Sequence, residues 1–281
     1  MRKIISSGIL LFASVCLVQA QTLDEIVSKH LEAMGGAKRL RAVQTMSMER
    51  VDADPSKKND TFTISRKRGN KFRMETNTFV PKYAIKIRNV EGCDGKSFWF
   101  VSTTGKTTPD PIIADEQPRI TPSDETCKII AEIDSPLLDY KTKKDRLTLA
   151  GSQKVANSDA YDLQLNNSSK HVAAHFYVDK KSFLLVKVVR ESNGSHTEDI
   201  YSNYRKVDGM MVPFLWETRW WAVRKDPALE EKAASVKIAG EEGSNKEIVK
   251  SVKFNVPLPD SLFSPPSATM PGKKSPPAAK K

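Results

Sequence analysis

Residues 66–74, RKRGNKFRM, and residues 93–100, CDGKSFWF, decide the fold of this chain. In each stretch a turn, Gly69-Asn70 or Asp94-Gly95, adjoins residues of β-type composition, as in an antiparallel hairpin. Similar short segments bounded by Gly, Pro, Asn or Asp recur along most of the chain. The sequence therefore predicts a sheet built from successive hairpins.

Two series of strands are predicted from the positions of these turn residues. The first comprises 44–53, 60–68, 71–78, 82–91 and 96–102, and the second comprises 146–150, 154–166, 171–179, 183–192, 196–206, 212–223, 234–240 and 246–254. So many short strands beside few helices predict an α+β fold. We expect a large curved antiparallel sheet, an incomplete β-barrel, with helices closing its concave face.

Three helical segments are expected. Thr22-Leu23-Asp24-Glu25 has the form of a capping box, and an amphipathic helix follows until Gly35-Gly36 ends it. A short helical turn is expected over 38–43. A proline-rich loop then leads, after Ser123, into a helix that carries Ile129, Ile130 and Ile133.

The two ends of the chain differ from its centre. Arg2 and Lys3 precede an apolar run over 4–18 that ends in Val18-Gln19-Ala20, which predicts a cleavable signal peptide over 1–20. A retained membrane anchor is the alternative, but this run is short and is interrupted by serines and a glycine. We expect a folded domain over 21–264 and a disordered basic tail over 265–281, rich in Pro, Ala, Ser and Lys.

The positive charge does not indicate a nucleic-acid-binding protein. The chain carries a formal charge of +11, and removal of the signal peptide leaves +9, of which the four lysines of the tail supply a large part. A charge excess at a tail is typical of a solvated end rather than of a binding stripe. We expect no nucleic-acid partner, and weak contact of the tail with anionic lipid is the alternative to mere solvation.

Only Cys93 and Cys127 remain after export. An oxidising compartment favours a disulfide between them, which would close a loop of about 35 residues and stabilise the fold by roughly 3 to 4 kcal/mol. The sequence leaves two free thiols open as the alternative.

No catalytic, metal or cofactor site is predicted. Of the four histidines, only His171 and His175 have a notable spacing, and in a strand they would lie about 13 Å apart, too far to share an ion. The chain lacks a nucleophile elbow, a phosphate loop and a dinucleotide fingerprint, and no pair of carboxylates stands out by spacing. We expect a protein that is not an enzyme.

Aromatic residues alternate onto one face of two predicted strands. They are Phe98 and Phe100 in the first series, and Phe214, Trp216 and Trp220 in the second. Such rings form either ordinary core or the lining of an apolar cavity, and periodicity does not separate the two readings.

Together with residues 66–74 and 93–100, three later stretches resemble the LolA-like family of periplasmic lipoprotein carriers. They are DSPLLDY at 134–140, FYVD at 176–179 followed by LLV at 184–186, and YRKVDG at 204–209. The resemblance covers most of residues 22–264. Within the family, the chain is similar to the branch of outer-membrane lipoprotein-sorting proteins. It implies an incomplete barrel, closed by helices over an apolar cavity.

The resemblance also implies a location, a ligand and two site residues. It places a monomeric carrier in the periplasm, binding the acyl chains of lipoproteins or another hydrophobic ligand and meeting transfer proteins of the inner and outer membranes. Arg68 corresponds to the family's strand arginine, expected to hold the helices closed, and Phe72 to a residue that faces the cavity. An envelope regulator or assembly factor of the same fold, binding a protein partner or a lipid signal, is the alternative.

Overall fold

The computed structural model describes residues 21–57, 60–106, 114–115, 119–122, 127, 131, 133, 135–141, 146–166, 173–192, 194–225 and 235–265. Within these residues fourteen strands form one sheet, and every paired neighbour is antiparallel. The predicted signal peptide lies outside the described part of the chain, as do residues 266–281 of the predicted tail.

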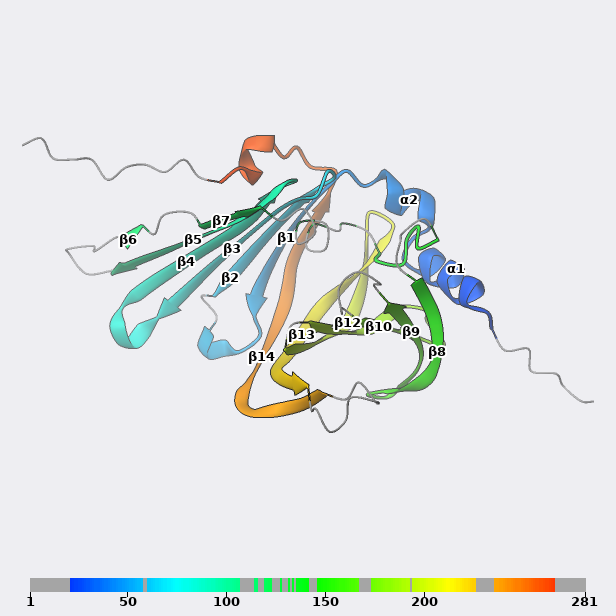
Figure 1. The fold of residues 1–281 in the computed structure, drawn as a ribbon. Coiled ribbons are helices and arrows are strands. Elements are labelled where there is room, and N and C mark those ends of the chain that lie inside the picture. Colours follow the sequence, from blue (N-terminus) through cyan, green and yellow to red (C-terminus); the bar gives the residue numbers. More distant parts are fainter. Residues whose placement is uncertain are drawn as a thin grey trace, which may run out of the picture.

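The sheet consists of two meanders joined by one long-range pairing. The first contains β1 (Thr45–Asp52), β2 (Thr61–Lys67), β3 (Lys71–Val80), β4 (Ile85–Asp94), β5 (Ser97–Lys106), β6 (Ala114–Asp115) and β7 (Arg119–Pro122). The second contains β8 (Arg146–Val155), β9 (Ser158–Asn166), β10 (Ala173–Asp179), β11 (Leu185–Ser192), β12 (Ser195–Val207), β13 (Met210–Lys225) and β14 (Ser235–Phe254). Strand β14 pairs with β1, so the two meanders spread to either side of this seam (Figure 1).

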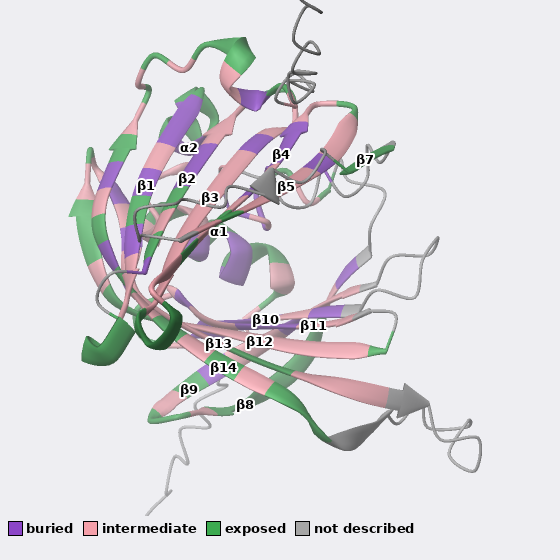
Figure 2. Ribbon diagram, turned by 90° about the vertical axis from the view of Figure 1, so that its left-hand side faces the viewer, coloured by how far each residue is buried: buried purple, intermediate pink, exposed green. Residues whose placement is uncertain are grey.

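The sheet curves but does not close. Its order runs from β6 to β8 through the seam, and these two strands are not paired with each other. Figure 2 shows the arm that carries β2 to β5 facing the arm that carries β9 to β13, with α1 (Leu23–Ala33) at the far end of the space between them. The open, curved antiparallel sheet expected from the sequence is therefore present.

One boundary predicted from the sequence is wrong. Residues 234–240 and 246–254 were expected to be two strands, but β14 continues through the polar stretch between them. Residues 242–245 pair with 218–221 of β13, so hydrogen bonds across the sheet outweigh the weak local strand propensity. A register shift next to this paired stretch accommodates Gly240, whose φ is +84°.

Both helices near the N-terminus form where the sequence places them. Thr22 caps α1, and the reciprocal hydrogen bonds between Thr22 and Glu25 complete the capping box. Helix α1 buries Ile26 and Val27 in a core shared with β8 to β11, and α2 (Ala37–Ala42) buries Leu40 against Met210. These helices cover only part of the sheet, and the predicted helix over 129–133 lies largely outside the described residues. A helical cover over the whole concave face is therefore not shown.

The joint between the two helices is attached to the hairpin of β12 and β13. Asp208 and Gly209 form its two-residue turn, both with positive φ, as the Asp-Gly pair favours. A Cβ atom at Gly35 would lie 2.6 Å from the Gly209 carbonyl oxygen, so this contact requires glycine. Arg39 donates to the carbonyl oxygens of both glycines, at 2.7 Å to Gly35 and 3.1 Å to Gly209. The joint between the helices is therefore held at a defined point of the sheet.

The opposite arm is held by a buried tryptophan and a disulfide. Trp99 is fully buried, and its indole N–H donates to the carbonyl oxygen of Phe263 at 2.8 Å. Cys93 and Cys127 are bonded, with their Cα atoms 5.6 Å apart, inside the core of the β1–β4 arm. Of the two alternatives that the sequence left open, the structure has the disulfide.

Replacing both cysteines by serine is expected to lower the free energy of unfolding by about 3 to 4 kcal/mol, because the cross-link restricts the unfolded chain. Denaturant unfolding of the oxidised and the reduced wild type measures this loss, and the variant should lose at least as much, because its serine hydroxyls would be buried in the core. Equal midpoints for oxidised and reduced wild type would contradict the expectation.

Candidate functional site

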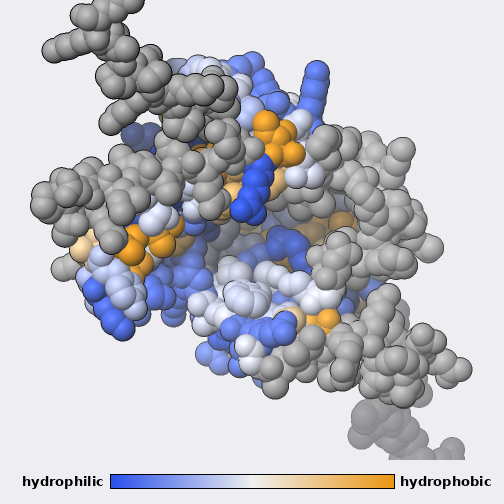
Figure 3. Space-filling view, turned by 60° about the vertical axis from the view of Figure 1, so that its left-hand side comes forward, coloured by the Kyte–Doolittle hydropathy of each residue, from blue (hydrophilic) through white to orange (hydrophobic). Residues whose placement is uncertain are grey.

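A cavity of about 480 Å³ lies between the two arms of the sheet and the two helices. Its walls come from β1, β2 and β3 on one side, from β11, β12 and β13 on the other, and from α1 and α2 at one end. In Figure 3 hydrophobic side chains are visible in the hollow between the arms, beside hydrophilic residues. This volume is typical of a pocket that binds one small molecule.

Methionine dominates the apolar lining. Five of the eight methionines of the chain line the cavity: Met34, Met46, Met48, Met210 and Met211. Aliphatic and aromatic residues complete the apolar walls, among them Val188, Phe72, Trp216 and Phe254. Because the unbranched thioether side chain changes rotamer easily, such a wall adapts to ligands of irregular shape.

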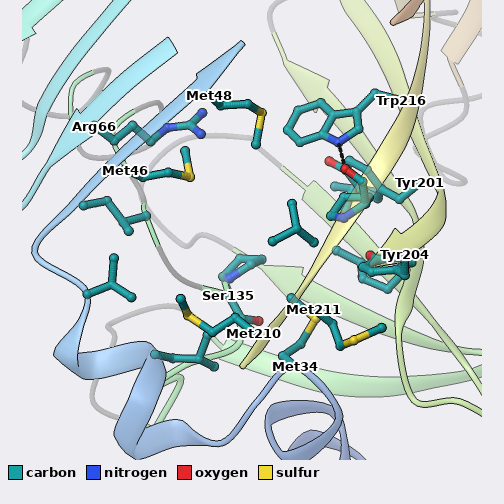
Figure 4. A pocket seen from close by; sticks show the side chains of 18 of the residues that line it. Met34, Met46, Met48, Arg66, Ser135, Tyr201, Tyr204, Met210, Met211 and Trp216 are labelled. Atoms are coloured by element: carbon teal, nitrogen blue, oxygen red, sulfur yellow. Dashed lines mark hydrogen bonds between the residues drawn. The ribbon is translucent and has the colours of Figure 1, made fainter. Parts of the chain in front are cut away.

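Charged and hydroxyl side chains gather toward one end of the cavity. Arg190 of β11 forms an ion pair with Asp199 of β12, and the Thr218 hydroxyl donates to the same carboxylate at 2.8 Å. The side chain of Arg190 is 40% accessible, and the residue lines the pocket. Arg66 points into the cavity from β2, across from Tyr201 and Trp216 (Figure 4).

Two tyrosines at this end stay protonated at neutral pH. Burial, followed by the nearby charge of Asp199, raises the pKa of Tyr201 to about 12. Burial also raises the pKa of Tyr204, whose hydroxyl donates to the Leu185 carbonyl oxygen at 2.6 Å. Both side chains therefore supply neutral hydroxyl groups to the cavity wall.

A second ion pair lies behind Trp216. Arg50 is 8% exposed, and its guanidinium lies 2.9 Å from a carboxylate oxygen of Glu247 and 4.6 Å from the Trp216 ring centroid. Burial raises the pKa of Glu247 in spite of the attraction of Arg50. The ring of Tyr201 packs against Trp216 in an edge-to-face arrangement, with the ring centroids 5.2 Å apart. Arg50 and Tyr201 together fix the position of this indole.

His30 defines the helical end of the cavity. Its Nδ1 lies 2.8 Å from the Phe183 carbonyl oxygen, so Nδ1 carries the proton and donates. The Ser135 hydroxyl then donates to Nε2, also at 2.8 Å. Burial lowers the pKa of His30 to about 4, although the bond to the carbonyl opposes this shift. The neutral imidazole therefore ties α1 to the turn before β11 and to residue 135.

The structure brings two of the predicted aromatic residues to the cavity. Phe72, which is 4% exposed, and Trp216 line it. Phe98 and Phe214 instead pack in or against the core of the β1–β4 arm and do not line the cavity, and neither does half-buried Phe100.

Trp220 also lies outside the cavity and is 47% exposed. It alternates onto the same strand face as Trp216, but four residues of strand carry it about 13 Å further along β13, beyond the cavity. The prediction that Trp220 lines the cavity is therefore corrected.

Arg68 lies at the rim of the structure rather than in the cavity. Its Nε donates to the Val43 carbonyl oxygen at 2.6 Å, and its Nη2 donates to the Leu40 carbonyl oxygen at 3.1 Å. These carbonyl groups lie at the C-terminal end of α2, where the Leu40 carbonyl oxygen also accepts the backbone N–H of Val43 at 3.3 Å. The arginine thus joins β2 to α2, and its gating role stays a prediction.

Sequence reasoning missed most of the polar lining. Arg66, Arg190, Asp199, Tyr201 and Tyr204 belong to segments predicted as strands, but period-2 alternation gives no sign of which polar residues face inward. The alternation of Met46 with Met48 was a usable signal, since Val51 is the one other apolar residue of β1. In the described residues no three His, Cys, Asp or Glu side chains are grouped so that they could hold a metal ion.

Comparisons with known proteins found matches among solved structures alone. No protein-family model and no curated protein matches the chain. Among solved structures, a LolA superfamily protein from Nitrosomonas europaea is 15% identical, with 88% of this chain and 99% of that chain covered and a TM-score of 0.45. The solved structures that match thus include the superfamily that the sequence resembles.

Two further solved structures are more distant. A DUF1329 family protein from Desulfovibrio piger is 12% identical, with 87% and 98% coverage and a TM-score of 0.39. MucB of Pseudomonas aeruginosa, in complex with MucA, is 8% identical, with 82% and 99% coverage and a TM-score of 0.20. At these identities and TM-scores, none of the three matches carries a conclusion about ligand or partner.

Stability is expected to fall by about 3 kcal/mol between pH 6.5 and pH 4 because of His30. In this window the unfolded state binds a proton that the folded state excludes, and below about pH 4 both states are protonated. Denaturant unfolding across this range should show a loss in His30→Gln that is smaller by about 3 kcal/mol than the loss in the wild type and in the control His175→Gln. The same pH slope in all three proteins would contradict the assignment.

Proposed function

We propose that this protein is a periplasmic carrier that shelters an acyl chain of a lipid or a lipoprotein in the methionine-lined cavity. The observation that supports this most directly is the largely apolar, adaptable lining of a 480 Å³ cavity that lies between the two arms of the sheet. The signal peptide predicted from the sequence supports export. Among the described residues, no helix is long and apolar enough to cross a membrane.

The energetics of burial suit a carrier without a covalent step. Each methylene group removed from water contributes about 0.8 kcal/mol, so a chain of several methylenes binds strongly by burial alone. The polar lining is already engaged in hydrogen bonds and ion pairs, such as Arg190 with Asp199 and Tyr204 with Leu185. We accordingly propose binding and transfer rather than catalysis.

Release of the ligand requires a part of the wall that moves, and we propose that α1 and α2 are that part. Both helices line the cavity, and they are attached to the sheet by discrete polar contacts. These contacts are the Gly35–Gly209 joint, the hydrogen bonds of His30 and the bonds of Arg68 to the end of α2. Exchange with membrane transfer proteins would open this side.

Met48→Trp is expected to weaken ligand binding at least tenfold, since a larger ring displaces two or more methylenes worth about 0.8 kcal/mol each. Native mass spectrometry of protein taken from the periplasm, and of stripped protein with added tripalmitoyl lipopeptide or palmitate, measures occupancy. The control is Ile248→Trp, which adds a tryptophan to the neighbouring strand outside the cavity. Protein that carries no lipid and takes up none would contradict the carrier, and a single co-purifying protein would favour the regulator.

Arg68→Leu is expected to loosen α2, because two hydrogen bonds from a charged group are lost, at a cost of about 1 to 2 kcal/mol in stability. Transfer of bound ligand to acceptor vesicles, followed by fluorescence, should become faster. Unchanged loading and release rates would remove the gating role from Arg68.

A further inference from the structure

Resting on the proposed acyl-chain binding, we propose that the cavity selects a single-chain amphiphile with an anionic head group. The head group would lie between Arg66 and Arg190, and the chain would run toward the helices. A free fatty acid and a lysophospholipid with an anionic phosphate both have this chemistry.

The volume of the cavity suits one chain. An apolar cavity of about 150 Å³ binds benzene, which has six carbon atoms, so 480 Å³ holds roughly 20 atoms of that size. One acyl chain of ordinary length with its head group uses this space. Three chains of a triacylated lipoprotein need about three times as much.

The charges of the lining favour an anion. Among the described residues that line the cavity, Arg66 and Arg190 carry positive charges and Asp199 carries a negative charge. The two guanidinium groups face the same space from opposite arms, on β2 and β11. A carboxylate or phosphate between them would accept charge-assisted hydrogen bonds, which an uncharged head group gains only in weaker form.

The neighbouring hydroxyl groups also favour the binding of an anion at this end of the cavity. Tyr201 lies near both arginines, since the charges of Arg190 and Arg66 both act on its hydroxyl. It stays neutral at physiological pH and so adds no negative charge that would repel a head group. The Thr218 hydroxyl donates to the Asp199 carboxylate, which also forms the ion pair with Arg190.

The opposite end of the cavity suits the chain. Figure 4 shows Met34, Met210 and Met211 gathered away from Arg66, Tyr201 and Trp216. His30 at this end is neutral, and both its ring nitrogens have partners within the protein. A polar head group gains nothing here, whereas methylene groups contact thioethers and aliphatic side chains. The two ends together define one orientation for the ligand.

The test uses the full mature protein, stripped of lipid, and four probes: palmitate, palmitoyl lysophosphatidic acid, monopalmitoylglycerol and tripalmitoyl lipopeptide. Calorimetry gives the affinities for the wild type, for Arg66→Met and for the control Arg205→Met. The control also removes one positive charge, from an exposed arginine on β12 that lies over Phe214 outside the cavity. Circular dichroism and denaturant unfolding establish that each variant is folded.

We expect one or both anionic probes to bind the wild type more tightly than monopalmitoylglycerol does. Arg66→Met should weaken anionic binding about 10- to 100-fold and leave monopalmitoylglycerol unchanged, since only the charged head group loses its partner. Arg205→Met should bind as the wild type does. The anionic probe that binds more tightly identifies the source of the head group.

The outcomes separate this inference from the proposed function. Equal binding of monopalmitoylglycerol and both anionic probes, unaffected by Arg66→Met, would overturn the anionic head group and keep the acyl-chain carrier. Tighter binding of the lipopeptide than of either single-chain anion would overturn the single chain and again keep the carrier. If none of the four probes binds, the proposed function itself fails.

Discussion

The antiparallel pairing of β1 with β14 joins strands that are about two hundred residues apart in the chain, and the rest of the structure depends on it. Every other step along the ordered path from β5 to β8 joins neighbours in sequence, so each meander is specified by local turns. The seam places the two meanders in one sheet, and the curvature of that sheet turns their inner faces toward each other. Met46 and Met48 lie on the seam strand β1 and therefore reach the cavity that the two arms enclose.

The polar groups of the cavity follow from this arrangement. Arg66 comes from one arm and Arg190, Asp199 and Tyr201 from the other, so their meeting depends on the seam and not on any local motif. Asp199, whose side chain is less accessible than that of Arg190, is compensated by the ion pair with Arg190 and by the hydrogen bond from Thr218. Arg66 and Tyr201 lie at one end of the cavity, beside Met46 and Met48, and Met34, Met210 and Met211 lie at the other (Figure 4). A wall that combines charged and apolar groups in this way favours an amphiphile over a pure hydrocarbon.

The helices provide the side of the cavity that is held by few hydrogen bonds. A sheet of this size is fixed by ladders of backbone hydrogen bonds. Helices α1 and α2 meet it through the apolar side chains of Ile26, Val27 and Leu40, and through the Gly35–Gly209 contact, the imidazole of His30 and the guanidinium of Arg68. Small groups of polar contacts are easier to exchange than a strand pairing. This difference in attachment is the physical basis for placing the moving wall at the helices.

The sequence by itself determined the capped first helix, the turn positions and nearly all strands, because capping boxes, Asp-Gly turns and period-2 alternation are local signals. It also supplied the two cysteines, Phe72 and Trp216. The tertiary structure alone decided that 234–240 and 246–254 form one strand, that Trp220 extends past the cavity, and that Arg66 and Arg190 face one space. The reason is that alternation divides a strand into two faces but does not say where along its length the opposite arm begins. That position is set by the β1–β14 register and by the curvature of the sheet, which involve residues far apart in the chain.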